Sequence, residues 1–350
     1  MNEEKLITPR NNNFMIGQDA AEQIFLQAWQ SGNMHHAWIL SGPNGIGKAT
    51  MAFRIVRFLL SADAGNKMAY KNMSISEKSA VFQQIAGGSN PDLLVLERDY
   101  IEADKKKILS AIKKGEALDE EELSGLKKSA FIRVDDVRKV GDFLSKTSFN
   151  DGWRVVIIDS ADDMNKNAAN ALLKILEEPP AKTILLLVSH NPGLLLPTIR
   201  SRCAKLPMHT LKDAEVASLL RRYRADLDEP TIAKLVEMAG GSIGKAILYA
   251  DMKAFTIYEE LCAILYAKQK FKLEQMLDFC TEIAADDSKF TLLEELLMKF
   301  FKDNMSSCQD VEAFYQCKCQ AVRMFDDCLS VNMDKRLMLV NLLTEICQVL

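Results

Sequence analysis

A glycine-rich turn between an apolar run and a helical pattern is the feature that most constrains this chain. The apolar run is Ala37–Ser41, the turn reads GPNGIGKA over residues 42–49, and a helical pattern continues from Ala49 to Leu60. This order is typical of a phosphate-binding loop, in which glycines let backbone N–H groups close around phosphate oxygens at a helix N-terminus. The turn therefore predicts an α/β domain of nucleotide-binding ancestry.

Three further apolar runs, separated by helical patterns, predict the rest of the sheet. They cover residues 92–96, 153–159 and 183–189. Strands that are apolar almost throughout, alternating with helices, indicate a parallel sheet covered on both faces. The expected fold class is an α/β P-loop domain followed by a small α-helical lid and an all-α domain.

The second half of the chain is predicted to be helical. Residues 211–250 have short helical patterns with turns near 228–230 and 240–244, and neither Gly nor Pro occurs from Lys245 to Leu350. Leu, Met, Phe and Cys recur there at helical spacing. We expect three parts, at 1–206, 207–250 and 251–350, with a charged, solvated insertion at about 99–130.

Charge and cysteine usage limit the possible functions. The net charge is −4, from 44 basic and 48 acidic residues, which disfavours tight DNA binding by the chain alone. The N-terminus has no apolar signal core, and no apolar run could span a membrane. The eight cysteines favour buried thiols in a reducing cytosol over a zinc set built from Cys308, Cys317, Cys319 and Cys328. We expect a cytoplasmic protein without zinc.

The phosphate-binding loop departs from a working one at its end. Lys48 is placed to reach the outer phosphates, but the next position, which needs Ser or Thr to hold Mg²⁺, is Ala49. Thr50 lies about 100° further round the helix, so it should not substitute. The candidate residues of this degenerate loop are Gly42, Gly45, Gly47, Lys48, Ala49 and Thr50.

Two later segments carry a more specific resemblance. Residues 170–180 read NALLKILEEPP, and residues 197–203 read PTIRSRC. With the loop and the strand ending in Asp159, they resemble the clamp-loader branch of AAA+ proteins. The likeness is dense over 15–60 and 89–206 and only architectural over the last hundred residues.

This resemblance implies a pentameric ring, assembled through helical collars, within the DNA polymerase III holoenzyme. The implied partners are ATP-hydrolysing gamma/tau subunits and a delta subunit, with the sliding clamp and primed DNA reached through the complex. No membrane contact is implied.

The resemblance also assigns the second half of the nucleotide site. Asp159 matches the metal-binding aspartate of the Walker B strand, but the glutamate that polarises water is replaced by Ser160, which cannot act as a base. Asp162 is near, but in the wrong phase of the strand exit. Two catalytic positions fail together, so no intrinsic ATP hydrolysis and no required cofactor are expected.

Three further positions follow from the family pattern. Arg202, in the SRC motif, matches an arginine that acts on ATP held by the adjacent subunit. His190 occupies the position of a polar sensor where relatives carry Thr or Asn, and Lys245 replaces a nucleotide-sensing arginine. A lysine lacks the planar fork of arginine, which weakens nucleotide sensing. Many relatives hold zinc between the loop helix and residues 91–93, where this chain has no cysteine.

Three other functions are weighed against this one. An active, gamma-like ATPase of the same ring is disfavoured by Ala49 and Ser160. A P-loop kinase or other nucleotide-binding enzyme would have no reason to carry the SRC and NALLKILEEPP segments. A stand-alone DNA-binding protein is disfavoured by the acidic balance. The favoured function is a non-hydrolysing clamp-loader subunit that supplies Arg202 in trans.

Overall fold

The computed structural model describes residues 7–101, 104–108, 110, 126, 128–146, 152–266, 273–306, 308, 310–331 and 333–350. Its contacts divide the chain into two compact units, Met1–Asp226 with Gly240–Lys245, and Leu227–Ala239 with Ala246–Leu350. The three-part division at 206 and 250 stays a prediction. Most of the predicted charged insertion lies outside the described residues.

The first unit is built on a parallel sheet with the strand order β2-β3-β4-β1-β5. Four strands match predicted runs closely, and the fifth was not predicted. Their bounds are β1 Ala37–Ser41, β2 Leu93–Glu97, β3 Arg154–Asp159, β4 Thr183–Ser189 and β5 Ala204–Pro207.

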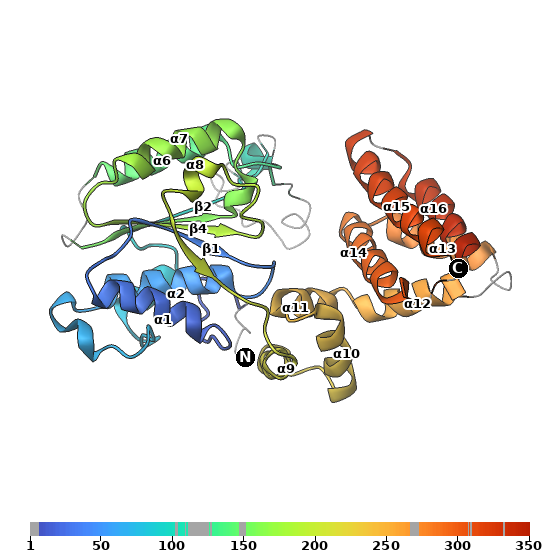
Figure 1. The fold of residues 1–350 in the computed structure, drawn as a ribbon, viewed down its shortest axis with the longest axis horizontal. Helices are drawn as coiled ribbons and strands as arrows, with labels where there is room; N and C mark the ends of the chain where they lie inside the picture. The colour runs from blue at the N-terminus through green and yellow to red at the C-terminus, as the bar shows by residue number, and fades with distance from the viewer. Residues whose placement is uncertain are drawn as a thin grey trace. The chain divides into compact units, whose positions relative to one another are not determined.

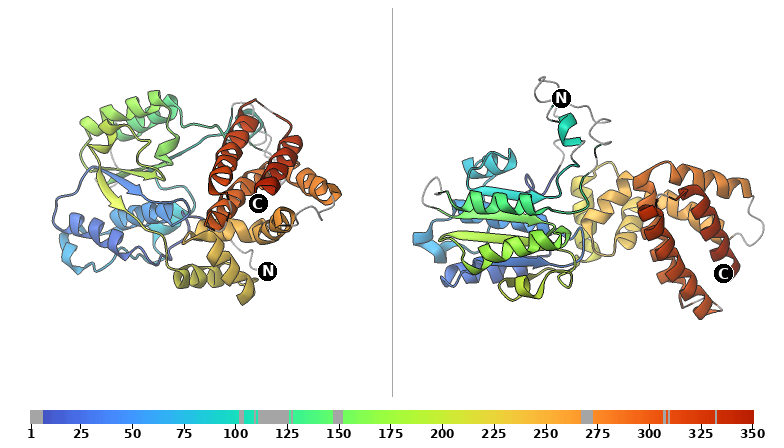
Figure 2. Two further views of the ribbon diagram at one scale, coloured as in Figure 1. Left: turned by 45° about the vertical axis from the view of Figure 1, so that its right-hand side comes forward. Right: turned by 90° about the horizontal axis from the view of Figure 1, so that it is seen from above.

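Helices cover both faces of this sheet (Figures 1 and 2). One face carries α1 (Asp19–Gln30) and α2 (Lys48–Ser61), and the other carries α6 (Val134–Leu144), α7 (Lys166–Glu177) and α8 (Pro197–Arg200). Residues 184–188 of strand β4 are all apolar because alternate residues enter two different cores, one beneath each helical layer. The expected α/β fold class is confirmed.

The first unit contains further helical elements besides those that cover the sheet. They include η1 (Ala64–Ala69), α3 (Ala80–Ala86), η2 (Ala161–Asp163) and α9 (Asp213–Tyr223). Helix α11 (Ile243–Asp251) begins in this unit and ends in the second.

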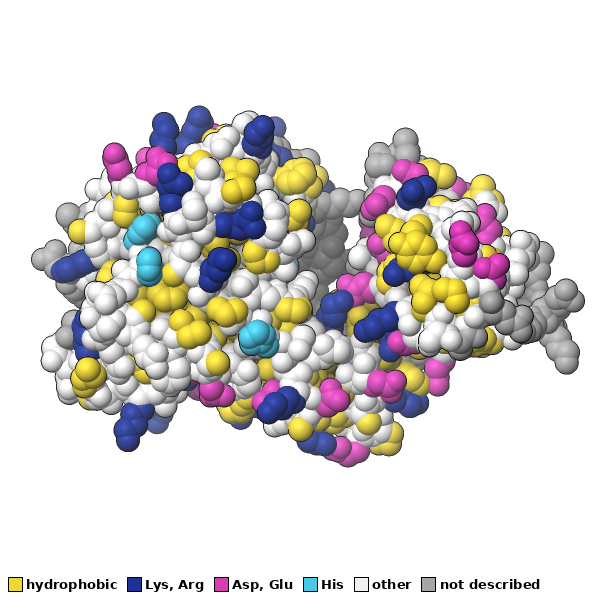
Figure 3. Space-filling model, viewed as in Figure 1, with side chains coloured by type: hydrophobic (Ala, Val, Ile, Leu, Met, Phe, Trp, Pro, Cys, Tyr) yellow, Lys and Arg dark blue, Asp and Glu magenta, His cyan; other side chains and the backbone are white. Residues whose placement is uncertain are grey.

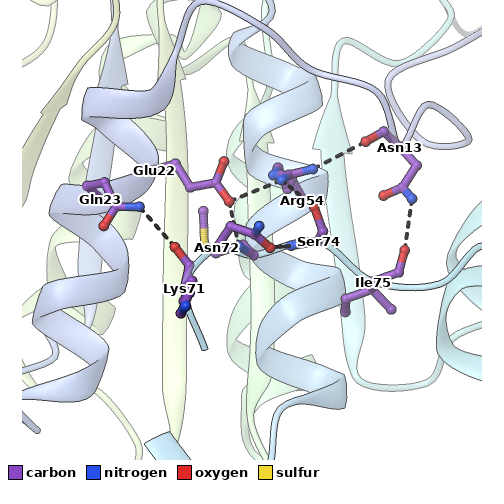
Figure 4. Close-up of polar contacts among 9 residues, drawn as sticks. Asn13, Glu22, Gln23, Arg54, Lys71, Asn72, Ser74 and Ile75 are labelled. Atoms are coloured by element: carbon purple, nitrogen blue, oxygen red, sulfur yellow. Dashed lines mark hydrogen bonds and ion pairs between the residues drawn. The ribbon is translucent and has the colours of Figure 1, made fainter. Parts of the chain in front are cut away.

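A buried arginine ties helix α2 to the N-terminal segment and to helix α1 (Figure 4). The Arg54 guanidinium donates to the Glu22 carboxylate at 3.1 Å, to the Asn13 carbonyl at 3.2 Å and to Ser74 Oγ at 2.8 Å. Both charged side chains are about 90% buried. A charge buried this deeply needs an ion-pair partner and hydrogen bonds, and this network supplies both while fixing how the first residues cross α2.

A second arginine of α2 holds the same N-terminal segment. Arg57 is 1% exposed and donates to the backbone carbonyls of Arg10 at 3.1 Å and Asn12 at 2.8 Å. Burial, together with the nearby charge of Arg54, lowers the pKa of Arg57 to about 10. We call residues 8–14 the N-terminal strap, because these two arginines hold its carbonyl groups.

The second unit is helical, as predicted. Its core contains five phenylalanines that are 0–1% exposed, at positions 290, 300, 301, 314 and 325. Its helices are α10 Glu229–Ala239, α12 Ala254–Tyr266, α13 Leu273–Ala284, α14 Asp287–Asn304, α15 Val311–Val331 and α16 Lys335–Val349. Within the described part of the chain, no helix is long and apolar enough to cross a membrane.

Candidate nucleotide site and the exposed arginine

The glycine-rich loop connects β1 to α2, as the sequence predicts. Gly45 has φ 75° and Gly47 has φ 97°, backbone conformations that residues with a side chain rarely adopt. A Cβ atom at Gly45 would lie 2.3 Å from Ser242 Oγ. The glycines here therefore serve a close approach within the protein as well as the turn itself.

Lys48 bonds to the loop that it belongs to. Its ammonium donates to the carbonyl of Gly42 at 2.7 Å and to that of Pro43 at 2.5 Å, and the residue is 3% exposed. Burial lowers the pKa of Lys48 to about 8, although the charges of Asp159 and Asp162 act in the opposite direction. These contacts use two of the three N–H donors of the Lys48 ammonium.

The segment expected to sense nucleotide is bonded to the same loop. Ser242 Oγ donates to the Asn44 carbonyl at 2.9 Å, and the Gly244 N–H donates to the Gly45 carbonyl at 2.8 Å. The Lys245 N–H donates to Ser242 Oγ at 3.2 Å. We call residues 44–45 with 242–244 the clasp, because their hydrogen bonds join the two segments.

Little space remains beside the loop on the side of Thr50. The cavity there has a volume of about 40 Å³, enough for a few water molecules but far below the usual size of a ligand pocket. Ala49 is not among its lining residues, which are Asn12, Phe14, Met15, Ile16, Ile46, Gly47, Thr50, Leu211, Leu219, Tyr223 and Ile243. A cavity of this volume is too small to hold a nucleotide.

Two of the predicted site residues bond to each other. Ser160 Oγ and His190 Nε2 share a hydrogen bond of 2.7 Å. Burial lowers the pKa of His190, with a further contribution from the charge of Lys48. Burial raises the pKa of Asp159, which ends β3 beside them. This hydrogen bond joins the two positions that were predicted to have lost the water-polarising glutamate and the usual sensor residue.

Asp162 has a structural role that sequence reasoning missed. One carboxylate oxygen accepts from Ser189 Oγ at 2.7 Å, and the other accepts from the N–H groups of His190 and Asn191. An aspartate just after a strand is a common acceptor for nearby backbone N–H groups, which is the only signal that could have indicated this role. Its carboxylate holds the loop that follows β4.

Arg202 lies away from the loop, beyond the opposite end of the sheet. In the register of the parallel pair β1–β5, Ala204 lies beside Trp38, whereas the loop begins at Gly42. The distance along the strand from Trp38 to Gly42 is four residues, or about 13 Å. Arg202 comes before Ala204 in the chain and therefore lies on the side of Ala204 that faces away from the loop. Its guanidinium donates to the Thr198 carbonyl at 3.0 Å and pairs with the Glu177 carboxylate at 2.9 Å.

The described cysteines show no arrangement for metal. Burial raises the pKa of Cys203 to about 12 and those of Cys280 and Cys317 to about 11. Among the residues that the structure describes, no group of three or more His, Cys, Asp or Glu side chains could hold an ion. The absence of zinc stays a prediction, which elemental analysis of the purified chain would test. One zinc per chain would contradict it.

Comparisons at the sequence level point to subunits of DNA polymerase III. The family model described as "DNA polymerase III, delta subunit" matches residues 17–212, more than half of the chain. The DNA polymerase III subunit delta' of Pseudomonas aeruginosa is 39% identical over 216 residues, which cover 59% of this chain and 53% of that protein. The subunit delta' of Bacillus subtilis is 26% identical over 230 residues, covering 66% and 58%.

A gamma subunit is also similar. DNA polymerase III subunit gamma of Buchnera aphidicola is 26% identical over 243 residues, which cover 68% of this chain and 57% of that protein. The chain thus spans little more than half the length of the curated relatives it matches.

Among solved structures, a DNA polymerase III gamma subunit-related protein of Thermotoga maritima matches at 16% identity and a TM-score of 0.39, covering 93% of this chain and 99% of that one. The RuvB Holliday junction branch migration motor of the same organism matches at 14% identity and a TM-score of 0.44, covering 92% and 88%. Likenesses this distant say nothing about function. The family match and the relatives at the sequence level together show that the chain belongs to the delta-prime family of DNA polymerase III clamp-loader subunits.

Proposed function

We propose that the chain is a non-hydrolysing clamp-loader subunit that supplies Arg202 to ATP bound by a neighbouring subunit. The observation that carries this proposal is the register of β5, which separates Arg202 from the loop of its own chain. An arginine at that end of the sheet cannot serve its own nucleotide site, but it can serve a site on another polypeptide.

The geometry of the chain's own site supports the non-hydrolysing half of the proposal. Ala49 offers no hydroxyl for Mg²⁺, and the Ser160–His190 hydrogen bond takes the place of a water-polarising carboxylate. Lys48 is bonded to its own loop. An ATPase uses a hydroxyl, a carboxylate and a lysine ammonium on the nucleotide. Here the hydroxyl and the carboxylate are missing, and the ammonium is hydrogen-bonded within its own loop.

An arginine suits the proposed role in trans. The transition state of phosphoryl transfer carries negative charge on the γ-phosphate oxygens, and a guanidinium binds such oxygens with a permanently charged, planar fork. Where such arginine fingers have been dissected, they are worth ~10³–10⁵ in rate. The neighbouring subunit would supply the metal and the attacking water.

The assembly that follows is a pentameric ring in the cytoplasm with gamma/tau and delta subunits, loading the sliding clamp on primed DNA. The helical region 251–350 acts as the collar that joins the ring. The chain then serves as a largely rigid member that completes one neighbouring active site.

The test is a reconstituted complex with Arg202→Ala. The variant should fold and assemble but show reduced clamp- and DNA-stimulated ATP turnover. Arg202→Lys should rescue poorly, because a lysine keeps the charge without the fork. Arg200→Ala should do less, and Lys205→Ala, at an exposed position of β5, is the cleaner control because Arg200 Nε is buried. Wild-type loading by Arg202→Ala would end the proposal.

A gamma-like ATPase is the second candidate, because a gamma subunit is among the similar proteins. An ATPase assay on the isolated chain separates the two. Magnesium-dependent turnover that Lys48→Ala abolishes would favour the gamma-like function.

A further inference from the structure

The guanidinium of Arg202 is held from two helices. Its Nη1 donates to the carbonyl of Thr198 in α8, and its Nη2 pairs with the carboxylate of Glu177, the last residue of α7. The carboxyl end of a helix favours a cation, because its last carbonyl groups carry partial negative charge. Arg202 thus meets two acceptors that come from different elements.

These contacts matter because the side chain is exposed. Arg202 is 37% exposed and Glu177 is 51% exposed, and an arginine side chain at such a surface would otherwise occupy many rotamers. Two of its five N–H donors are used in these contacts, which leaves others for a phosphate. An ion pair this exposed adds little to stability, so losing it should not unfold the chain.

We propose that Glu177 is a positioning residue for Arg202. The Glu177 carboxylate holds the Arg202 guanidinium in one conformation, so that less rotamer entropy is lost when the guanidinium binds the neighbour's triphosphate. This inference rests on the proposed function, and it adds a residue on which the supplied arginine depends. Glu178, the next residue, is an exposed carboxylate outside this ion pair and gives a matched control.

The decisive experiment is a double-mutant cycle in the reconstituted complex. Glu177→Ala should lower kcat for clamp- and DNA-stimulated ATP turnover by about tenfold, since a misplaced catalytic group costs up to about a hundredfold. KM for ATP should not change, because the neighbour binds the ATP. Glu177→Gln should retain part of the rate through its amide oxygen, and Glu178→Ala should match the wild type. In an Arg202→Ala background, Glu177→Ala should add nothing.

A second measurement does not depend on activity. In the isolated chain, ¹⁵N NMR of the arginine side chains should show slowed rotation for the buried Arg54 and Arg57 and also for the guanidinium of Arg202, whose signal is assigned by its loss in Arg202→Lys. Glu177→Ala should speed the rotation of the Arg202 guanidinium, and Glu178→Ala should not.

The outcomes separate the two proposals. If Arg202→Ala supports wild-type turnover, the proposed function fails and the positioning role fails with it. If Arg202→Ala is impaired while Glu177→Ala is normal, or while the two effects add, only the positioning role of Glu177 is overturned.

Discussion

Lys48 is predicted from its place in the loop to reach phosphates, yet its ammonium donates here to carbonyl groups of the loop itself. Its pKa is about 8 in the folded chain, against an ordinary value of 10.5. Between these two pH values the unfolded chain binds more protons at this residue than the folded chain does. The free energy of unfolding should therefore rise with pH across this window through the contribution of Lys48.

A comparison with Lys48→Met isolates this contribution, because the other groups titrate in both proteins. Urea unfolding at several pH values should show the wild type gaining stability over the variant from pH 8 to about 10.5. Parallel pH profiles for the two proteins would contradict the burial of a charged ammonium at this site.

The catalytic positions lead to a second prediction at this scale. The isolated chain should not hydrolyse ATP above background, and Ala49→Thr alone should not restore activity, because Ser160 still lacks a carboxylate. Ser160→Glu alone should also fail to restore activity, because Ala49 still offers no hydroxyl to hold Mg²⁺. Turnover by either single variant, measured with and without Mg²⁺, would show that one position suffices.

Sequence reasoning named Ser160 and His190 but treated them as separate departures from a pattern. Their hydrogen bond could not be predicted, because it depends on two strands whose ends meet only in the folded sheet. The loop motif likewise indicates what Lys48 could bind in an active relative. The motif does not indicate that the Lys48 ammonium donates to carbonyl groups of its own loop.

At the scale of elements, the clasp makes the glycine-rich loop a joint between two segments. A Cβ atom at Gly244 would lie 2.7 Å from Gly45 Cα and 3.2 Å from the Gly45 carbonyl oxygen. Neither backbone can yield easily, so Gly244→Ala should destabilise the first unit by about 2 kcal/mol, as for other overpacked sites.

The matched control is Gly141→Ala in α6, where an added Cβ meets nothing within 4 Å. Alanine in a helix interior should stabilise by about 0.5–1 kcal/mol relative to glycine. Thermal or urea unfolding of the two variants should move in opposite directions. Equal effects would mean that the clasp has no energetic importance.

The elements also show where pattern reasoning fails. Four strands were predicted because their apolar runs are nearly continuous, but β5 has four residues, only Leu206 is fully buried, and Pro207 ends it. Such a short strand forms only because it pairs with β1, so its own sequence does not predict it. The arginines of α2 were missed for a related reason, since charged residues in a helix pattern are expected to face solvent.

At the scale of the whole molecule, the second unit carries an apolar surface suited to assembly. In the view of Figure 3, apolar side chains gather on this unit among side chains of both charges. On α15, Val311, Tyr315 and Val322 are 52%, 55% and 37% exposed. Their spacing places them within about 40° of each other round the helix, on one stripe.

If the proposed ring contact uses this stripe, Tyr315→Asp should weaken assembly with the proposed partner subunits at least tenfold, because a charge would enter an apolar contact. Gln316→Asp, exposed on another side of α15, should assemble normally. Sedimentation of mixtures with candidate partners measures the difference, and circular dichroism checks that both variants fold. Unchanged assembly by Tyr315→Asp would place the collar contact elsewhere.

The sequence did not indicate which helices belong to which unit. Residues 227–239 group with 246–350, whereas 240–245 group with the first unit. Helical periodicity marks which residues of a helix are buried, but it does not identify the partner that buries them.

The N-terminal strap has a consequence for recombinant chains that are shortened at the N-terminus. Met15 lies directly after the strap. A product begun there would lack the carbonyl groups of Arg10, Asn12 and Asn13, to which Arg54 and Arg57 donate. Two guanidinium groups would remain buried without those acceptors, so a recombinant chain begun at Met15 should be recovered mainly as insoluble protein.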